Sequence, residues 1–416
     1  VAELAIAQPA GEQTLLHYYK SWCLIRLGKT AEAQIAIATA EKEPADYCFP
    51  NALEAIEALQ CVVDFAGKAP KALYYLGNLW YDKRRYPTAI AAWERSSRED
   101  ETFPTVWRNL SLAYFNKMNR PDEAVTLLEK AFRLDHTDAR VLMELDQLYK
   151  RLNRPHIERL CFLEQHIDIV MTRDDLYLEY VTLLNQTGQY REAIRRIDQR
   201  KFHPWEGGEG KVPAQYQLAR LELAKELINR KKYDDALALI DECYIYPTHL
   251  GEGKLPGAQE NDFNYYKAYI LQQQGRPEEA HSLFVKACSG NSQPAAAMYY
   301  NDQKPDKIFY QGLAYRKLGE EEKARSRFNQ LITYGEEHLF DRFKMDYFAV
   351  SLPDLLIWED DMDKKNRIHC NYLMALGHLG LGNRTKAEHF FDIAASMDNN
   401  HQGVQIHRKL MNTILS

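Results

Sequence analysis

The stretch Ala72-Leu-Tyr-Tyr-Leu-Gly-Asn-Leu-Trp-Tyr81, followed by Arg85-Tyr-Pro-Thr-Ala-Ile-Ala-Ala-Trp93, decides the fold class of this chain. In the first segment Leu73, Leu76 and Trp80 recur at steps of three and four residues, the spacing of one face of an α-helix. In the second segment, an alanine and a tryptophan four residues apart share a face in the same way. The two segments therefore predict a pair of helices joined by a short turn.

The same pattern returns after Pro104, at a step of about 34 residues. There Trp107 and Leu110 repeat the face of the first helix, and Ala124 begins the face of the second. An alanine early in the second helix marks the further copies: Ala33, Ala193, Ala236, Ala280, Ala324 and Ala387. One copy, near residues 139–169, is degenerate, because Arg159 stands near the place of the alanine.

These copies resemble the tetratricopeptide repeat, whose pattern runs W-x-x-L-G-x-x-Y, then a small residue, F-x-x-A and a proline. The resemblance implies that small side chains let the paired helices approach, while large ones fill the groove between them. The sequence also lacks convincing strands of alternating period. We therefore expect an all-α fold, a right-handed tetratricopeptide superhelix of about nine helix pairs with irregular loop insertions.

Three segments escape the repeat pattern, at residues 203–213, 248–262 and 334–367. Insertions in helical solenoids map to one face, which is often the binding face. The repeats and insertions together suggest four regions. They are an N-terminal helical region (1–69), tetratricopeptide repeats (70–200), repeats with two loop insertions (201–333), and a long insertion with a C-terminal repeat (334–416).

Composition narrows the possible classes of function. The chain has 416 residues, 45% hydrophobic residues and a net charge of −6, without a basic tract that would indicate nucleic-acid binding. It has neither an apolar run long enough for a membrane span nor a signal peptide. Seven scattered cysteines favour a reducing compartment, so we expect a cytoplasmic protein. The first residue, Val1, suggests a fragment of a longer protein or a processed end.

The two shorter insertions contain the same four-residue sequence. Phe202-His-Pro-Trp-Glu-Gly-Gly-Glu-Gly-Lys211 ends in Gly-Glu-Gly-Lys, and Gly251-Glu-Gly-Lys254 repeats that sequence. The glycines break helical periodicity, while the first loop also carries an imidazole, an indole and two carboxylates. The longest insertion contributes Phe348-Ala-Val-Ser-Leu-Pro-Asp-Leu-Leu-Ile-Trp358. We therefore place the candidate functional site in these loops.

These loop motifs resemble a family of large bacterial proteins with an N-terminal mutarotase-like β-sandwich of unknown function and a C-terminal tetratricopeptide half. The resemblance covers most of residues 50–416 and implies that this chain is the C-terminal half. It also implies a context linked to carbohydrates. It supplies no catalytic residue.

Our leading hypothesis is a non-catalytic interaction scaffold that docks a partner protein or its own N-terminal domain. The alternative is a carbohydrate-binding or glycoside-processing site that the β-sandwich completes, so whether the whole protein is an enzyme stays open. Both hypotheses use the same candidate residues: His203, Trp205, Glu206, Glu209, Lys211, Glu252, Lys254, Asp354 and Trp358. We assign no catalytic residue, metal ligand or cofactor, and the oligomeric state stays open.

Other interpretations of these residues are weaker. Glu206 and Glu209 could act as a pair of carboxylates on a sugar, but the favoured interpretation is that they cap the next helix and pair with Lys211. The Gly-Glu-Gly-Lys loops lack the preceding strand and the Ser or Thr of a phosphate-binding loop. The acidic run 359–363 lacks the spacing of a calcium loop. A peptide clamp would need basic and amide side chains on first helices, where Lys71, Asn78, Arg108 and Asn109 fit poorly.

Overall fold

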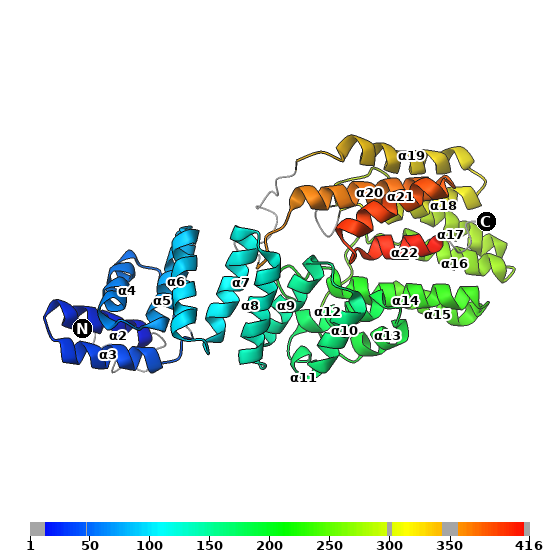
Figure 1. The fold of residues 1–416 in the computed structure, drawn as a ribbon. Helices are drawn as coiled ribbons and strands as arrows, with labels where there is room; N and C mark the ends of the chain where they lie inside the picture. Colours follow the sequence, from blue (N-terminus) through cyan, green and yellow to red (C-terminus); the bar gives the residue numbers. More distant parts are fainter. Residues whose placement is uncertain (1–12, 47, 298–301, 343–356, 412–416) are drawn as a thin grey trace. The chain divides into compact units, whose positions relative to one another are not determined.

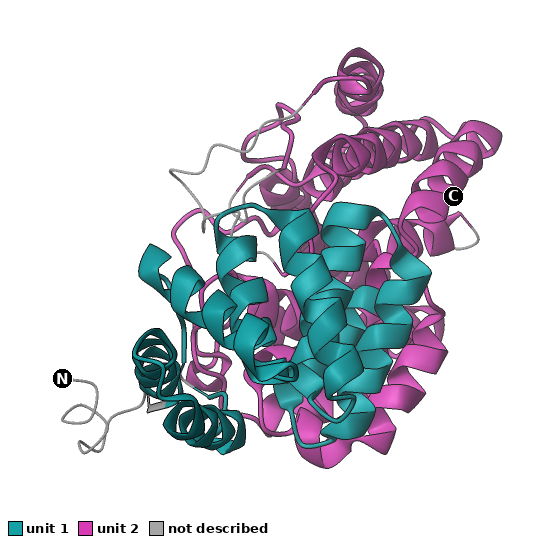
Figure 2. Ribbon diagram, turned by 60° about the vertical axis from the view of Figure 1, so that its left-hand side comes forward, with its two compact units in different colours: residues 1–148 teal, residues 149–416 magenta. Residues whose placement is uncertain are grey.

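The computed structural model describes residues 13–46, 48–297, 302–342 and 357–411. All regular structure in these ranges is helical, and the helices follow one another in antiparallel pairs (Figure 1). The all-α solenoid expected from the sequence is therefore confirmed. The chain divides into two compact units, residues 1–148 and 149–416, which Figure 2 colours separately.

Unit 1 is built from helix pairs in sequence order, and between residues 13 and 134 each helix packs against its neighbours in the chain. Its helices are α2 (Gln13–Arg26), α3 (Thr30–Lys42), α4 (Leu53–Ala66), α5 (Pro70–Asp82), α6 (Tyr86–Glu99), α7 (Pro104–Met118), α8 (Pro121–Leu134) and most of α9 (Ala139–Arg151). Proline begins several of these helices, because the first helical N–H needs no acceptor.

Unit 2 continues the pairing with longer connections. Its helices are α10 (His156–Gln165), α11 (Ile167–Val170), α12 (Asp174–Gln186), α13 (Tyr190–Asp198), α14 (Lys211–Asn229), α15 (Tyr233–Cys243), α16 (Asn261–Gln273), α17 (Pro277–Ala287), α18 (Pro305–Lys317), α19 (Glu321–His338), α20 (Met362–Gly380), α21 (Arg384–Met397) and α22 (Gln402–Leu410). A 3-10 turn, η1 (Thr248–Leu250), precedes the second Gly-Glu-Gly-Lys segment. Within the described ranges, no helix combines the length and the apolar composition that crossing a bilayer requires.

The alanines that mark the repeats lie at the helix contacts. Each of them is at least 98% buried: Ala33, Ala89, Ala124, Ala193, Ala236, Ala280, Ala324 and Ala387. A glycine in the first helix of a pair has the same role. A Cβ on Gly312 of α18 would lie 2.4 Å from the ring of Phe328 in α19, and this ring is fully buried. Small residues therefore set the distance between paired helices, as the repeat pattern indicates.

Unit 2 also folds back on itself through the turn between α21 and α22. The guanidinium of Arg159 donates to the side-chain oxygen of Asn400 at 2.7 Å, and Gln186 donates to the carbonyl of Asn400 at 2.8 Å. Asn153 and Asn399 are joined by two further hydrogen bonds. The arginine that interrupts the repeat pattern thus links the first and last helices of this unit.

We expect Gly312→Ala to lower the free energy of unfolding by about 1–3 kcal/mol, because the added methyl group must displace the packed Phe328 ring. Urea unfolding followed by circular dichroism measures the change. Gly253→Ala is the matched control, since a Cβ there has no neighbour within 4 Å and its effect should stay within about 1 kcal/mol. Equal losses in the two variants would contradict the packing argument.

Candidate functional site

The two glycine-rich loops lie side by side in unit 2. The backbone N–H of Phe202 donates to the carbonyl of His249 at 2.8 Å, and that of Gly210 donates to the carboxylate of Glu252 at 2.7 Å. A Cβ on Gly251 would lie 2.7 Å from the carbonyl oxygen of Phe202. The close approach of the backbones therefore requires glycine at this position, and we call the two segments, residues 202–211 and 249–254, the paired loops.

Glu252 acts as the cap of a helix that lies elsewhere in the sequence. Gly210 precedes α14 in a left-handed conformation (φ 72°) and has no side chain, so the acceptor for its N–H comes from the other loop. A carboxylate also suits the positive end of the helix dipole. Burial raises the pKa of Glu252, the hydrogen bond from Gly210 lowers it, and the nearby charge of Glu209 raises it again.

The first loop is hydrogen-bonded within itself. Gly208 donates to the carbonyl of Trp205 at 3.0 Å, and Lys211 donates to the carbonyl of Gly208 at 3.0 Å. A Cβ on Gly208 would lie 2.4 Å from the indole, so the Trp205 ring rests directly on the glycine backbone. The indole stays partly exposed, and Glu206 beside it is exposed. Glu209 accepts a hydrogen bond from the N–H of Gly207 at 3.3 Å.

His203 is hydrogen-bonded to Asp174, the first residue of α12. The carboxylate of Asp174 accepts from the backbone N–H of His203 at 2.9 Å and contacts its ring Nδ1 at 3.0 Å, while Arg200 donates to the other oxygen at 2.6 Å. Burial opposes ionisation of Asp174, but the hydrogen bonds from His203 and Arg200 outweigh it and lower its pKa. The His203 side chain is 75% exposed, so the imidazole is presented on the surface.

The pKa of Lys211 is influenced by charged side chains at the start of unit 2. Its pKa is lowered by desolvation and by the ammonium of Lys150, and the carboxylates of Glu179 and Glu209 act in the opposite direction. Among them, Glu179 accepts from Lys150 at 2.9 Å and from Arg159 at 2.7 Å. Burial opposes ionisation of Glu179, but these two cations lower its pKa to about 2.

The remaining candidates do not join the paired loops. Lys254 donates to the carbonyl of Tyr244 at 3.1 Å and pairs with Glu260, both close to it in sequence. Trp358 is only 1% exposed, and its carbonyl accepts from Arg151 at 3.0 Å, so its indole is not a surface anchor in this structure. Asp354 lies outside the described residues.

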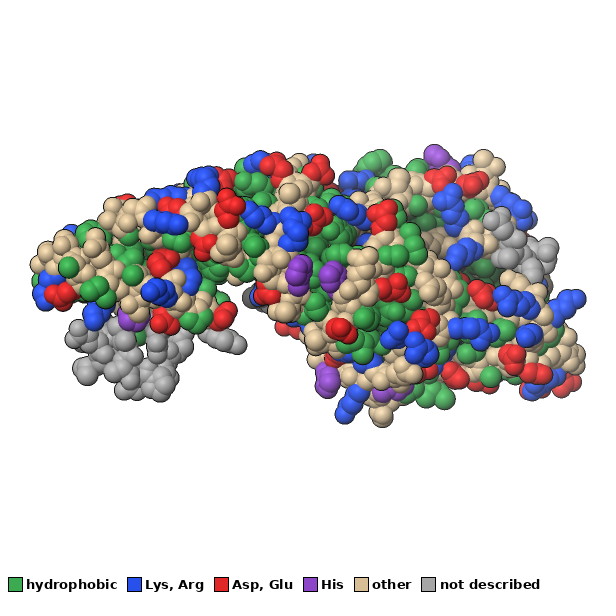
Figure 3. All heavy atoms as spheres, turned by 60° about the horizontal axis from the view of Figure 1, so that its bottom comes forward, with side chains coloured by type: hydrophobic (Ala, Val, Ile, Leu, Met, Phe, Trp, Pro, Cys, Tyr) green, Lys and Arg blue, Asp and Glu red, His purple; other side chains and the backbone are tan. Residues whose placement is uncertain are grey.

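The basic and amide residues that fitted a peptide clamp poorly are engaged within unit 1. Arg108 donates two hydrogen bonds of 2.6 Å to Glu144, and Asn109 donates to Asn78 at 3.0 Å. The Lys71 side chain donates to the carbonyl of Glu43. Across the described part of the chain, no group of three or more His, Cys, Asp or Glu side chains is placed to hold a metal ion. Acidic and basic side chains are mixed over the face that Figure 3 presents.

Fold and loops together define a helical-repeat scaffold, an architecture that offers extended surfaces to protein partners. The tetratricopeptide-repeat family matches residues 308–334, which span parts of α18 and α19.

Two solved structures are similar to the chain. One is a tetratricopeptide repeat protein from Parabacteroides merdae ATCC 43184, with 16% identity over 73% of this chain and 99% of that chain and a TM-score of 0.28. The other comes from the complex of Naa15/Naa10 bound to HypK-THB, with 11% identity over 96% of this chain and 66% of that chain and a TM-score of 0.41.

Removal of the Glu252 carboxylate should destabilise the start of α14. We expect Glu252→Ala to lower the free energy of unfolding by about 1 kcal/mol, because the Gly210 N–H loses its acceptor. Glu252→Gln is the control, since its amide oxygen can still accept, and it should lose less. Urea unfolding of the three proteins at one pH measures both effects, and identical losses would rule out the capping role.

The ion pairs of Glu179 with Lys150 and Arg159 should make the free energy of unfolding depend on pH. A carboxyl whose pKa is lowered in the folded state stabilises the fold at pH values above its ordinary pKa of 4.5. This contribution is lost as the pH falls toward 2. At pH 7 we expect Glu179→Gln to be destabilised by about 3 kcal/mol or more, since two cations lose their partner. The difference in unfolding free energy between Glu179→Gln and the wild type should narrow between pH 5 and pH 2, because protonation of Glu179 in the wild type removes the same ion pairs.

Denaturant midpoints measured at each pH provide this comparison. Glu158→Gln, which changes an exposed carboxylate of α10, is the control and should differ little from the wild type at any pH. A gap between Glu179→Gln and wild type that stays constant over the range would contradict the assigned role of Glu179.

Proposed function

We propose that this chain is a non-catalytic docking scaffold, and that the paired loops are the surface that binds a partner protein domain. The observation that carries the proposal is the hydrogen bond from Gly210 to Glu252, which joins the two loops. A surface fixed in this way loses little conformational freedom on binding, which favours affinity. Its exposed or partly exposed groups are the imidazole of His203, the indole of Trp205 and the carboxylate of Glu206.

The hydrogen bonds that Glu252 and Glu209 already make within the loops support docking over catalysis. Glu252 is used as a helix cap, and Glu209 is hydrogen-bonded within its own loop. A glycoside-processing pair needs one carboxyl to donate a proton and the other to attack or to activate water, with both facing the sugar. Trp205 instead combines a large apolar surface with a polar edge, a side chain that is frequent at the energetic centres of protein interfaces.

We further propose that the partner is a β-sandwich domain of the same, longer protein, in a bacterial, cytoplasmic and carbohydrate-related context. This identity rests on the resemblance of the loop motifs to such two-part proteins. The loops carry both carboxylates and lysines, and this mixture fits a domain surface better than it fits a nucleic acid, which would require a basic face.

A carbohydrate site is the second candidate function, because one feature favours it. Trp205 offers a partly exposed indole beside Glu206 and Glu209, and aromatic faces with neighbouring carboxylates suit the stacking and hydrogen bonding of sugars. In that case the β-sandwich would complete the site, and the chain alone would bind sugar weakly.

Isothermal titration of the chain with the separately expressed β-sandwich domain tests the docking proposal. We expect saturable binding that weakens at least tenfold in Trp205→Ala, about 1.4 kcal/mol, since the indole is the largest exposed apolar group of the loops. Trp107→Ala in unit 1 is the matched control, because that indole is also partly exposed but lies outside the loops.

A panel of mono- and oligosaccharides is then titrated into the same proteins. Binding to the sandwich that Trp205→Ala leaves unchanged would remove the paired loops from the interface. Heat with a sugar that is lost in Trp205→Ala, without binding to the sandwich, would replace the docking proposal by the carbohydrate site.

A further inference from the structure

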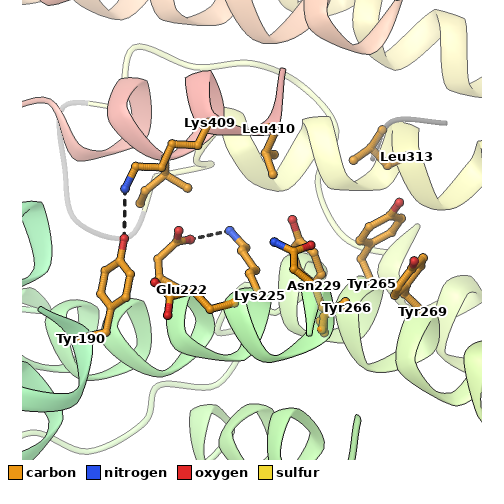
Figure 4. A pocket seen from close by; sticks show the side chains of 13 residues that line it. Tyr190, Glu222, Lys225, Asn229, Tyr265, Tyr266, Tyr269, Leu313, Lys409 and Leu410 are labelled. Carbon is orange, nitrogen blue, oxygen red and sulfur yellow. Dashed lines mark hydrogen bonds and ion pairs between the residues drawn. The ribbon is translucent and has the colours of Figure 1, made fainter. Parts of the chain in front are cut away.

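A second candidate site lies in unit 2, away from the paired loops. A pocket of about 220 Å³ opens between α14 and α16 on one side and α22 on the other (Figure 4). Its apolar lining includes Tyr265 and Tyr269 from α16, Leu313 from α18, and Ile406 and Leu410 from α22. An apolar cavity of about 150 Å³ holds a benzene ring, so this pocket has room for a larger ring system.

The aromatic wall of the pocket is fixed by the core behind it. Tyr265 is 8% exposed, and the centroid of its ring lies 5.8 Å from that of Phe284 and 5.7 Å from that of Tyr310. The neighbouring Tyr266, which also lines the pocket, packs its ring 5.6 Å from the same Tyr310. Phe284 and Tyr310 are themselves buried. This wall is therefore largely pre-formed, as the walls of small-molecule sites usually are.

The charged side chains that line the pocket are balanced in sign and are engaged within the protein. On α14 the ammonium of Lys225 lies 2.5 Å from the carboxylate of Glu222, and both side chains are largely buried. One turn further along, Glu226 pairs at 3.9 Å with the arginine that follows the helix. On α22 Lys409 donates to the hydroxyl of Tyr190 at 3.1 Å. Among the described residues, the lining thus carries two ammonium groups and two carboxylates.

This balance disfavours a ligand with a net charge. A carboxylate in the pocket would lose part of its hydration and would face Glu222 and Glu226 as well as the two lysines. An ammonium would lose hydration in the same way and would face Lys225 and Lys409. Because both signs are present in equal number, neither ion gains a net attraction that would offset this cost. An uncharged ring has no such cost.

Polar groups at one end of the pocket can orient an uncharged ligand. Asn229 follows Lys225 by one helical turn on α14 and is exposed, and Tyr269 of α16 is partly exposed. Figure 4 shows both residues away from the end where Lys409 meets Tyr190. A side-chain amide and a phenol each offer a donor and an acceptor. A carbonyl, amide or hydroxyl of a ligand can therefore be hydrogen-bonded there without carrying a charge.

We propose that this pocket binds a small, uncharged, planar aromatic molecule. The ring lies between Tyr265 and Tyr269 of α16 and Leu410 of α22, and its polar group contacts the amide of Asn229. Aromatic walls favour a planar ring through stacking and edge contacts. The site is independent of the docking surface, because it shares no residue with the paired loops.

Three probes of one shape and three charges test the proposal by calorimetry on the full chain. Naphthalene-2-carboxamide is neutral, naphthalene-2-carboxylate is an anion, and naphthalene-2-carboxamidine is a cation. We expect saturable one-to-one binding of the amide. Both ions should bind at least about tenfold more weakly, a difference of about 1.4 kcal/mol, because each brings an unbalanced charge into the pocket.

Variants of the aromatic wall test where the amide binds. Tyr269→Ala should weaken its binding about tenfold, since the substitution removes one face of the ring site. Tyr86→Ala is the matched control, because Tyr86 is a partly exposed tyrosine of α6 in unit 1, and it should leave the affinity unchanged. Melting curves verify that each variant is folded.

A second pair of variants tests the balance of charge. Glu226→Gln removes one carboxylate from the lining, so the anionic probe should bind several-fold more tightly while the amide is unaffected. Glu279→Gln in α17 is the matched control, since that carboxylate also pairs with an arginine but does not line the pocket. It should change neither affinity.

Four results would overturn the proposal. One is the absence of saturable heat with the amide up to its limit of solubility in the wild-type chain. Another is binding of either ion as tight as that of the amide. The third is amide binding that Tyr269→Ala leaves unchanged, which would place the ligand elsewhere on the chain. The fourth is a carboxylate affinity that Glu226→Gln leaves unchanged, because the balance of charge would then not be what excludes the anion.

Discussion

The close approach of paired helices at small residues is the constraint on which the rest of this structure depends. At Gly77 a Cβ would lie 2.2 Å from the indole of Trp93, and at Gly312 it would lie 2.4 Å from the ring of Phe328. The aromatic ring of one helix therefore occupies the space that any larger side chain on its partner would need. Buried alanines allow a similar approach in the other pairs, and the irregular segments are the ones that connect the helices. The candidate docking surface lies in two such connections.

Where the repeat pattern fails, the structure gains a long-range link. Arg159 replaces the small residue of a repeat and is 1% exposed, yet its charge is satisfied by Glu179 and by the side chain of Asn400. A buried ion pair contributes little net stability, because desolvation offsets the attraction. It does penalise every arrangement that leaves the charge unpaired. The Arg159 contacts therefore specify how the last turn of unit 2 meets its first helices, and α22, which follows that turn, lies opposite α14 and α16.

The sequence predicts the all-α repeat fold because that fold depends on local spacing. The alanines of the repeats could be located by eye and are all buried, and the two loop insertions were visible as breaks in the pattern. The roles of the loop residues could not be predicted in this way. Two identical Gly-Glu-Gly-Lys segments use their side chains differently, since Glu252 caps α14 and Glu209 stays in its own loop. The pocket that Tyr190, Tyr265 and Leu410 help to line (Figure 4) could not be predicted either, because these residues come from three helices and meet only in three dimensions. The closely spaced tyrosines of α16 were the one sequence signal that could have drawn attention to it.

A raised carboxyl pKa often marks a catalytic acid, so the pKa of Glu252 needs a physical explanation before it can support either function. Burial is the main cause, and the charge of Glu209 adds to it. The hydrogen bond from Gly210 acts in the opposite direction, because a helix N-terminus stabilises the ionised form. A general acid needs an environment that favours its protonated form and a path to the substrate. Glu252 instead directs its oxygen at a backbone N–H, so its raised pKa follows from joining two loops and gives no independent support for catalysis.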